Sequence, residues 1–261
     1  MFIHRDEQSL SGGVKSSAPR FRFMEKTLKR QGFLRRLRIV PLLGGALFLL
    51  CVWGFFEIAE DYPEGRYNEF DVTILRSLRT VEDPAVPRGP YWLKDVMRDL
   101  SALGSTAVLT VGVAGIIGYL MLQHRWRRAL AVLLACGGGA LLNLGLKALA
   151  ARPRPEIVPH LAEVTDSSFP SGHSMLSAII YLSVGAMLAQ NSTGKATAVY
   201  PLILAVILTF VVGFTRIYLG VHFPSDVLAG WTAGLAWTLL CIATVSFLDR
   251  RSSSRLTHKN R

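Results

Sequence analysis

Cysteine is scarce in this chain of 261 residues, and the few cysteines are scattered. Cys51, Cys136 and Cys241 each fall inside an apolar stretch, and none of them clusters with another cysteine or with a histidine. This spacing indicates neither a disulfide framework nor a zinc site, so we expect small packing residues. Carboxylate clusters that would hold magnesium or zinc are equally missing beside the motifs described below, and we expect neither a metal nor a cofactor.

Charge is missing from six stretches of about 17–22 residues, each long enough to cross a bilayer core as a helix. Hydrophobic residues make up 51% of the chain, which is too apolar for an ordinary soluble domain. We therefore predict an all-α, polytopic membrane protein built as a bundle of six transmembrane helices. The predicted spans are Ile39–Phe56, Ser101–Leu122, Ala129–Leu146, Ser174–Gln190, Ala196–Thr215 and Val227–Leu248.

The segment 59–100 between the first two predicted spans is too long for a plain loop. Apolar residues recur in it at helical spacing, a proline-rich turn follows, and Tyr91–Leu100 has a helical pattern again. Aromatic residues in this segment suit the depth of the membrane–water interface. We predict short amphipathic helices that lie at the outer interface. The apolar residues that recur at helical spacing before the proline-rich turn are Phe70, Ile74, Leu75 and Leu78.

Acidic residues are outnumbered by basic ones, 18 against 29, which gives a net charge of +11. The excess is confined to a few segments. Residues 1–38 hold ten basic and three acidic side chains, 249–261 hold five and one, and the link 123–128 holds three arginines, whereas 59–100 holds six basic and nine acidic. Basic segments flanking membrane spans remain cytoplasmic. The distribution thus indicates membrane topology, and we expect no nucleic-acid partner.

The topology divides the chain into three parts. A basic arm (1–38) and a basic tail (249–261) are predicted to be cytoplasmic, and the arm is predicted to contact anionic membrane lipids. The membrane domain covers 39–248. Its loops 151–173 and 216–226 then face outward with 59–100, on the periplasmic side of an inner membrane if the protein is bacterial.

Pro170, Ser171, Gly172 and His173 stand where the loop 151–173 enters the fourth predicted span. Proline and serine are ordinary helix-start residues, and the N–H groups of a helix N-terminus bind anions. Glycine lets the backbone approach a ligand closely, and a histidine there can donate a proton to an oxygen that leaves a bound phosphate. A capped helix with an interfacial histidine is the alternative.

A second group of polar residues connects the last two predicted spans. Thr215 and Arg216 end the fifth span, and His222 and Asp226 follow at a spacing of four, which places both on one face if a helix begins near Phe223. A carboxylate bonded to one imidazole nitrogen fixes the tautomer and leaves the other nitrogen free to attack. The alternatives are a helix-capping aspartate, a surface histidine and an arginine that extends to the interface.

Two further cations lie at the end of the third predicted span. Lys147 and Arg154 are seven residues apart, two helical turns if the helix continues, and Pro155 then stops it. Arginine binds phosphate oxygens as a fork and lysine as a point charge. Cations flanking a span are common, and spacing alone does not separate Arg154 from Arg152.

Together the three groups read K-x6-R-P, P-S-G-H and T-R-x5-H-x3-D. The chain resembles the type 2 phosphatidic acid phosphatase family, over about 39–248, although the third motif of that family usually opens with serine rather than with Thr215. The resemblance implies a lipid phosphatase that uses no cofactor. It selects Arg154 over Arg152. The implied phosphate-binding residues are Lys147, Arg154, Ser171, Gly172 and Arg216, and the implied catalytic residues are His173 as general acid, His222 as nucleophile and Asp226 as the residue that orients it.

These residues predict phosphoryl transfer through a phosphohistidine, with a lipid phosphate as the partner of the site. A vanadium-dependent haloperoxidase has a similar pocket but is typically soluble, and a lipid-binding or transport protein needs the cations but not the histidine pair. Undecaprenyl pyrophosphate is the favoured substrate because only about 20 residues separate the first two motifs, which is an argument by analogy. Phosphatidic acid, phosphatidylglycerophosphate and lipid A phosphates are the other candidates.

Overall fold

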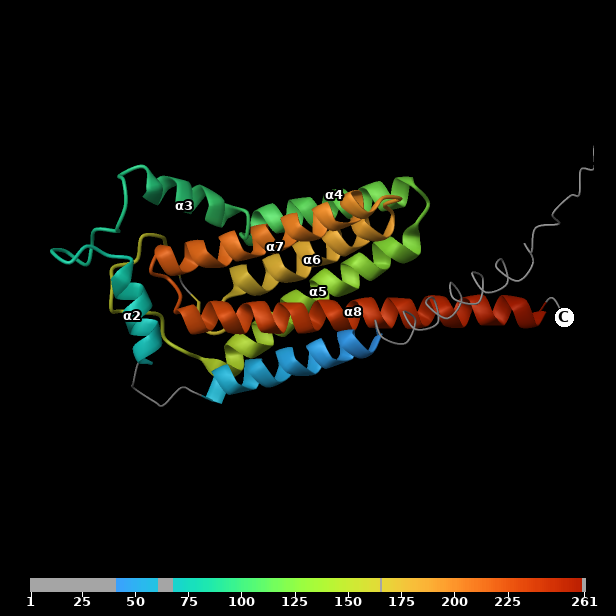
Figure 1. Cartoon of the computed structure of the whole chain (residues 1–261), viewed down its shortest axis with the longest axis horizontal. Coiled ribbons are helices and arrows are strands. Elements are labelled where there is room, and N and C mark those ends of the chain that lie inside the picture. The colour runs from blue at the N-terminus through green and yellow to red at the C-terminus, as the bar shows by residue number, and fades with distance from the viewer. Residues whose placement is uncertain (1–40, 61–67, 165, 260–261) are drawn as a thin grey trace, which may run out of the picture. The chain divides into compact units, whose positions relative to one another are not determined.

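The computed structural model describes residues 41–60, 68–164 and 166–259, and the regular elements in these ranges are helices (Figure 1). A single bridge between Arg79 and Pro87 is the β-type pairing found there. The predicted arm 1–38 lies outside the described residues. The helices are Pro41–Glu60, α2 (Glu69–Ser77), α3 (Leu93–Ala102), α4 (Thr106–Leu122), α5 (Trp126–Ala150), α6 (Gly172–Gln190), α7 (Lys195–Tyr218) and α8 (Pro224–Lys259).

Five of these helices are long and apolar enough to cross a membrane: Pro41–Glu60, α5, α6, α7 and the Pro224–Leu248 part of α8. The remaining predicted span, Ser101–Leu122, corresponds mainly to α4, which passes the same test only together with α3, and these two helices meet at an angle of 42°. The prediction of an all-α polytopic membrane protein is therefore confirmed. Helix α8 continues to Lys259, so the predicted tail 249–261 begins as an extension of the last span.

The two short helices predicted between the first spans are present as α2 and α3. Asn68 caps α2 by accepting a hydrogen bond from the Phe70 N–H at 2.9 Å. The helix α2 packs against α8 and buries Leu75 and Asp71 completely. An aspartate buried on a short loop helix needs a partner, and that partner lies at the site described below.

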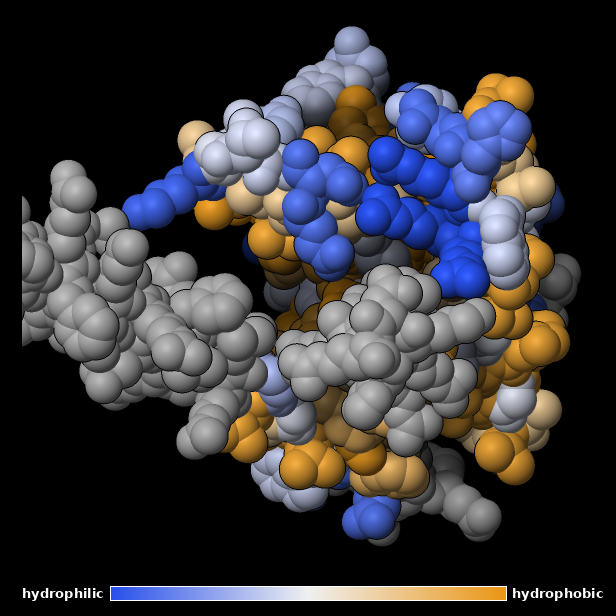
Figure 2. Space-filling model, turned by 90° about the vertical axis from the view of Figure 1, so that its right-hand side faces the viewer, coloured by the Kyte–Doolittle hydropathy of each residue, from blue (hydrophilic) through white to orange (hydrophobic). Residues whose placement is uncertain are grey.

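Large apolar side chains on the spans point outward. Leu141 and Leu144 of α5 and Phe210 of α7 are more than half exposed, as a surface solvated by lipid requires and one solvated by water would disfavour. Figure 2 looks onto the end of the bundle with the α4–α5 link. Hydrophilic residues gather on this end, and hydrophobic residues lie along the sides behind it.

Helix α6 packs most extensively against α7 and α8. Two glycines on one face of α8, Gly230 and Gly234, permit the second of these contacts. A Cβ at either position would come within 2.7 Å of a backbone oxygen of α6, that of Ser171 or Met175 respectively. This close approach fixes the first turn of α6 beside the first turn of α8, and so brings the second and third motifs together.

Candidate active site

All the residues predicted for the site lie at one end of the bundle, opposite the α4–α5 link. Because α5 to α8 alternate in direction, the C-terminal ends of α5 and α7 meet the N-terminal ends of α6 and α8 there (Figure 1). Lys147 comes from the last turn of α5 and Arg216 from that of α7, while His173 and Asp226 belong to the first turns of α6 and α8. His222 lies in the turn between α7 and α8.

The helix that carries Lys147 does not continue to Arg154, so the two-turn spacing considered above does not apply. Helix α5 ends at Ala150, and Ala151 takes the left-handed conformation with φ 44°. Arg154 instead sits in an irregular segment, where Nη1 donates to the carbonyl of Val221 at 2.6 Å. The chain reversal, rather than helix periodicity, brings Arg154 beside the third motif.

His222 faces Asp226 on one side and Arg154 on the other. Its Nδ1 lies 3.5 Å from Oδ2 of Asp226, and its Nε2 lies 3.2 Å from Nη1 of Arg154. Arginine only donates, so the Nε2 contact is a hydrogen bond only when Nε2 carries a lone pair and the proton is on Nδ1, toward Asp226. This tautomer leaves the nitrogen beside the cation as the nucleophilic one.

His222 and Asp226 face each other, as their spacing of four predicts for a helix that begins near Phe223. Helix α8 begins at Pro224, and His222 lies two residues before its first residue. Asp226 reaches back to the helix start, where its Oδ2 accepts the Phe223 N–H at 2.8 Å and a hydrogen bond from the Ser168 hydroxyl. Asp226 therefore caps the helix and also faces the imidazole. A helix-capping aspartate and an aspartate that orients His222, given as alternatives above, are the same residue in the same conformation.

The electrostatic environment keeps the imidazole of His222 neutral. Burial lowers the pKa of His222 to about 4, and the cations Arg154 and Arg216 act in the same direction, while Asp226 opposes them. The ring is thus unprotonated at neutral pH, as a nucleophile requires.

Lys147 and Arg154 are held together by a residue that the sequence analysis did not single out. The carboxylate of Asp166 bridges them, with Oδ2 at 2.7 Å from Lys147 Nζ and Oδ1 at 2.5 Å from Arg154 Nη2. Burial opposes ionisation of Asp166, but the two cations outweigh it and lower its pKa to about 2. Its side chain is 59% exposed, so an anion with two oxygens occupies an accessible position between the two cations.

Arg216 is a buried cation with a spare donor. It is 5% exposed, and its Nη1 donates to the Ser101 hydroxyl at 2.8 Å. Its Nε is buried without a hydrogen-bond partner among the described residues. An unpaired buried N–H of a cation is costly unless an anion meets it.

The backbone at the start of α6 is accessible to a ligand. Ser171 caps the helix, its N–H donates to the Asp226 carbonyl at 3.0 Å, and its hydroxyl accepts a hydrogen bond from the Ser174 hydroxyl at 3.0 Å. Since the Ser171 N–H is engaged, the first N–H groups of the helix that lack an intrahelical acceptor are those of Gly172 and His173. A Cβ at Gly172 would stand 3.6 Å from Cε of Lys147.

His173 completes the group from α6. Its ring packs at the bend between α3 and α4, where a Cβ on Gly104 would lie 3.3 Å from the ring carbon Cδ2. The charges of Arg216, Arg154 and His222 act on it. The general acid predicted from the motif is thus within electrostatic reach of the predicted nucleophile and of two predicted phosphate ligands.

Arg152 and Arg154, which spacing could not separate, lie in different places. Arg154 contacts Nε2 of His222, whereas Arg152 lies behind Asp226, with Nη1 at 2.5 Å from Oδ1. Arg152 also lies 4.1 Å from the ring centre of Phe223. No sequence pattern indicated this second position, because it depends on how the loop folds over α8.

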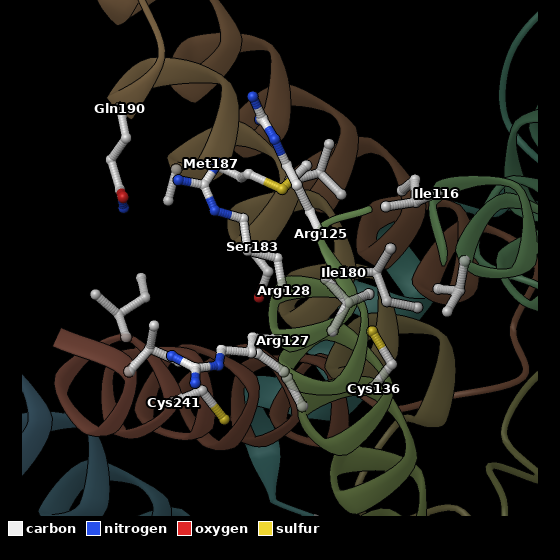
Figure 3. A pocket seen from close by; sticks show the side chains of 18 of the residues that line it. Ile116, Arg125, Arg127, Arg128, Cys136, Ile180, Ser183, Met187, Gln190 and Cys241 are labelled. Carbon is white, nitrogen blue, oxygen red and sulfur yellow. The ribbon is translucent and has the colours of Figure 1, made fainter. Parts of the chain in front are cut away.

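A cavity of about 530 Å³ lies at the other end of the bundle. Figure 3 shows Arg125, Arg127 and Arg128 around it, with apolar residues such as Ile180 and Met187 on its walls. None of the motif residues lines it. The cavity is therefore separate from the candidate active site.

Comparisons with known proteins agree with the geometry. The profile of the PAP2 superfamily matches residues 128–250. Phosphatidylglycerophosphatase B of Bacillus subtilis is 38% identical over 149 residues, which cover 55% of this chain and 71% of that protein. An undecaprenyl-diphosphatase of Sulfolobus acidocaldarius is 39% identical over 70 residues, 27% of this chain and 30% of that protein.

A solved structure extends the likeness to the fold. The crystal structure of a transmembrane PAP2 type phosphatidylglycerolphosphate phosphatase from Bacillus subtilis superposes with a TM-score of 0.66 at 29% identity, covering 78% of this chain and 96% of that one. The family match, the relative and this structure agree with one another and with the membrane helices. The chain belongs to the PAP2 superfamily and is a membrane lipid phosphatase, a hydrolase of phosphoric esters.

Proposed function

We propose that the chain hydrolyses a lipid phosphate through a phosphohistidine on His222. Nε2 attacks phosphorus in line, so that an N–P bond forms as the bond to the leaving oxygen breaks, and His173 gives its proton to that oxygen. His173 then takes a proton from water, which cleaves the N–P bond, releases inorganic phosphate and restores the imidazole. Asp226 holds the Nδ1–H proton throughout.

The arrangement around Asp166 is the single observation that carries this proposal. One carboxylate presents two oxygens to Lys147 and Arg154, and Arg154 also contacts Nε2 of His222. A phosphate that replaced this carboxylate would meet the same two cations with its phosphorus on the side of the attacking nitrogen. The spare Nε of Arg216 and the first N–H groups of α6 supply further donors for the charge of the transition state.

Metal-independent chemistry is part of the proposal. Lys147, Arg154 and Arg216 provide three permanent positive charges at the reacting phosphate, which is the contribution that a divalent cation makes in other phosphoryl-transfer sites. Activity should persist in excess EDTA, and vanadate should inhibit by occupying the phosphate position. A loss of activity in EDTA that magnesium restores would contradict this part.

Two substrates are proposed, each on its own observation. Phosphatidylglycerophosphate is placed first, because the relative and the solved structure that cover most of this chain are named for that lipid or its phosphatase. Undecaprenyl pyrophosphate, favoured by the short separation of the first two motifs, is placed second and is supported by the shorter match to an undecaprenyl-diphosphatase. Both carry a terminal phosphate on a lipid.

Phosphate release from a panel of lipids tests the assignment. Purified protein in detergent or liposomes is given these two lipids, phosphatidic acid and a lipid A phosphate at equal surface concentration, with the His222→Ala variant as background. The expected result is a higher kcat/KM for phosphatidylglycerophosphate than for the others. A higher kcat/KM for undecaprenyl pyrophosphate would make that lipid the first candidate substrate. No phosphate release from any of the four lipids would overturn the proposal.

We further propose that the site faces outward and that both termini are cytoplasmic. The three arginines of the α4–α5 link lie at the end of the bundle opposite the motifs, as the positive-inside rule expects. Glu163→Cys on the motif loop and Thr193→Cys on the α6–α7 link, each in a variant lacking the native cysteines, can be treated with an impermeant maleimide in intact cells. The first should be labelled and the second only after lysis. The reverse pattern would place the chemistry in the cytoplasm.

A further inference from the structure

A buried charge network continues from the site into α2, beyond the three motifs. Asp71 of α2 has an exposed fraction of 0%. Its Oδ1 accepts the Ser225 N–H at 2.9 Å, and its Oδ2 accepts the Ser225 hydroxyl at 2.5 Å and Nη2 of Arg152 at 3.2 Å. A short helix of the loop between the first spans is thereby bonded to the first turn of α8.

Arg152 connects this carboxylate to Asp226. Its side chain is 9% exposed, and its Nη1 donates to Oδ1 of Asp226 at 2.5 Å and to the Ser225 hydroxyl at 3.1 Å. Asp71 and Asp226, both fully buried, thus share one guanidinium. Leaving either carboxylate without that cation would be strongly unfavourable, because a buried charge would lose its partner.

The two oxygens of Asp226 have separate partners. Oδ1 is bonded to Arg152, while Oδ2 faces Nδ1 of His222 and also accepts from Ser168 and the Phe223 N–H. A carboxylate held at one oxygen cannot rotate freely. The bond to Arg152 at Oδ1 therefore acts together with the bonds at Oδ2 to set which oxygen faces the imidazole.

We propose that Arg152 and Asp71 are positioning residues for the phosphatase reaction: Asp71 holds the guanidinium of Arg152, which holds Asp226 in the orientation that keeps Nδ1 of His222 protonated and Nε2 aimed at phosphorus. This rests on the proposed function of His222. Neither residue binds the phosphate, because both terminal nitrogens of Arg152 are engaged by carboxylates on the far side of Asp226. The activity of the site consequently depends on the packing of α2 against α8.

The proposal makes a specific kinetic prediction. Arg152→Gln should lower kcat about 10–100-fold and leave KM within about 2-fold, as loss of a residue that orients a catalytic group does. Asp71→Asn, which keeps the side-chain shape, should lower kcat about 3–10-fold because Arg152 remains but is less firmly held. Arg152→Lys, which keeps a cation beside Asp226, should recover part of the activity lost in Arg152→Gln. Arg154→Gln serves as the matched control, since a phosphate ligand should change KM as well.

A double-mutant cycle separates positioning from general stabilisation. If Asp71 acts through Arg152, then adding Asp71→Asn to Arg152→Gln should cause no further loss of kcat, whereas independent effects would multiply. Thermal unfolding of each purified variant reports any loss of folding separately. Multiplied losses, a rise in KM with kcat unchanged, or wild-type kcat in Arg152→Gln would each overturn the proposal.

The pH dependence of kcat/KM gives a further test, because a residue that only stabilises the fold would not shift its acidic limb. The charged or titratable groups acting on His222 are Asp226, Arg154, Arg216 and, through the mutual effect of the two imidazoles, His173. Removing the cation from Asp226 leaves its negative charge less compensated, which favours the imidazolium. The acidic limb of kcat/KM should therefore move to higher pH in Arg152→Gln, and an unmoved limb counts against the proposal.

Failure of this inference is distinguishable from failure of the proposed function. If His222→Ala retains turnover, the phosphohistidine mechanism itself is wrong. If His222→Ala is inactive but the cycle between Asp71 and Arg152 is additive, the mechanism stands and only the positioning role is lost.

Discussion

The two ends of the helix bundle both carry clusters of cations, but the cations are buried at one end and exposed at the other. At the motif end Lys147 and Arg216 are buried and bonded to oxygen atoms from other segments. At the opposite end the side chains of Arg125, Arg127 and Arg128 are exposed. The guanidinium carbon of Arg127 lies 5.4 Å from the ring centre of the adjacent Trp126. Burying a cation costs free energy that exposure avoids. Both ends carry permanent cations, so burial is what distinguishes the cations proposed to serve the reaction from those proposed to set the membrane topology.

The largest effect should come from the nucleophile at the buried end. His222→Ala should reduce turnover by at least about 10⁴-fold, because the covalent route disappears. The measurement is phosphate release by the purified variant, with thermal unfolding as the control for folding. Turnover near the wild-type rate would contradict the mechanism.

A matched pair of arginine substitutions tests the comparison itself. Arg154→Gln should reduce kcat/KM about 10²–10³-fold, since a donor to the transition-state charge is lost. The same change at the exposed end, Arg127→Gln, should stay within about 2-fold, since surface charges contribute little. Equal effects at both ends, measured on the same lipid, would remove the distinction between the two clusters.

The acidic limb of the pH profile should report the environment of His222. Because its pKa is lowered to about 4, the imidazole is neutral above that pH and becomes protonated below it. Only the neutral form attacks, so kcat/KM should fall about tenfold per pH unit below about 4 and be insensitive to this group above about 5. A limb near 6.5, the ordinary value, would indicate that burial and the neighbouring arginines do not act as described.

The smallest change predicted at the motif end concerns Asp166, the carboxylate that occupies the position proposed for phosphate. Asp166→Asn removes a competing anion from Lys147 and Arg154, so KM should fall about 2–10-fold with kcat little changed. The inhibition constant for vanadate should fall in parallel. A rise in both constants would show instead that Asp166 is needed to hold the two cations in place.

Much of the fold was predictable because membrane helices obey a simple rule. Charge-free stretches of sufficient length mark spans, and the excess of acidic over basic residues in 59–100 set that segment apart from the basic ones. The short helices α2 and α3 followed from apolar periodicity. The bend that divides α3 from α4 was not predicted as a bend, although the expected interfacial helix and the following span fall close to the two observed helices.

The site was predictable where the motifs are contiguous and not where it depends on chain reversals. The meeting of the three motifs at one end followed from helix alternation. The sequence left open whether the helix continues to Arg154, because no local signal indicated the left-handed Ala151. Asp71 is 155 residues from Asp226 in the sequence, and only the packing of α2 on α8 brings them to one guanidinium.

Direct detection of the covalent intermediate tests the central claim most directly. Enzyme mixed with a lipid phosphate labelled in its terminal phosphate can be quenched within milliseconds under alkaline conditions, which preserve phosphohistidine, and digested for peptide mapping. The account predicts acid-labile label on the peptide containing His222, formed at a rate no slower than turnover and absent from His222→Ala. Turnover without label, or label on His173, would contradict the account.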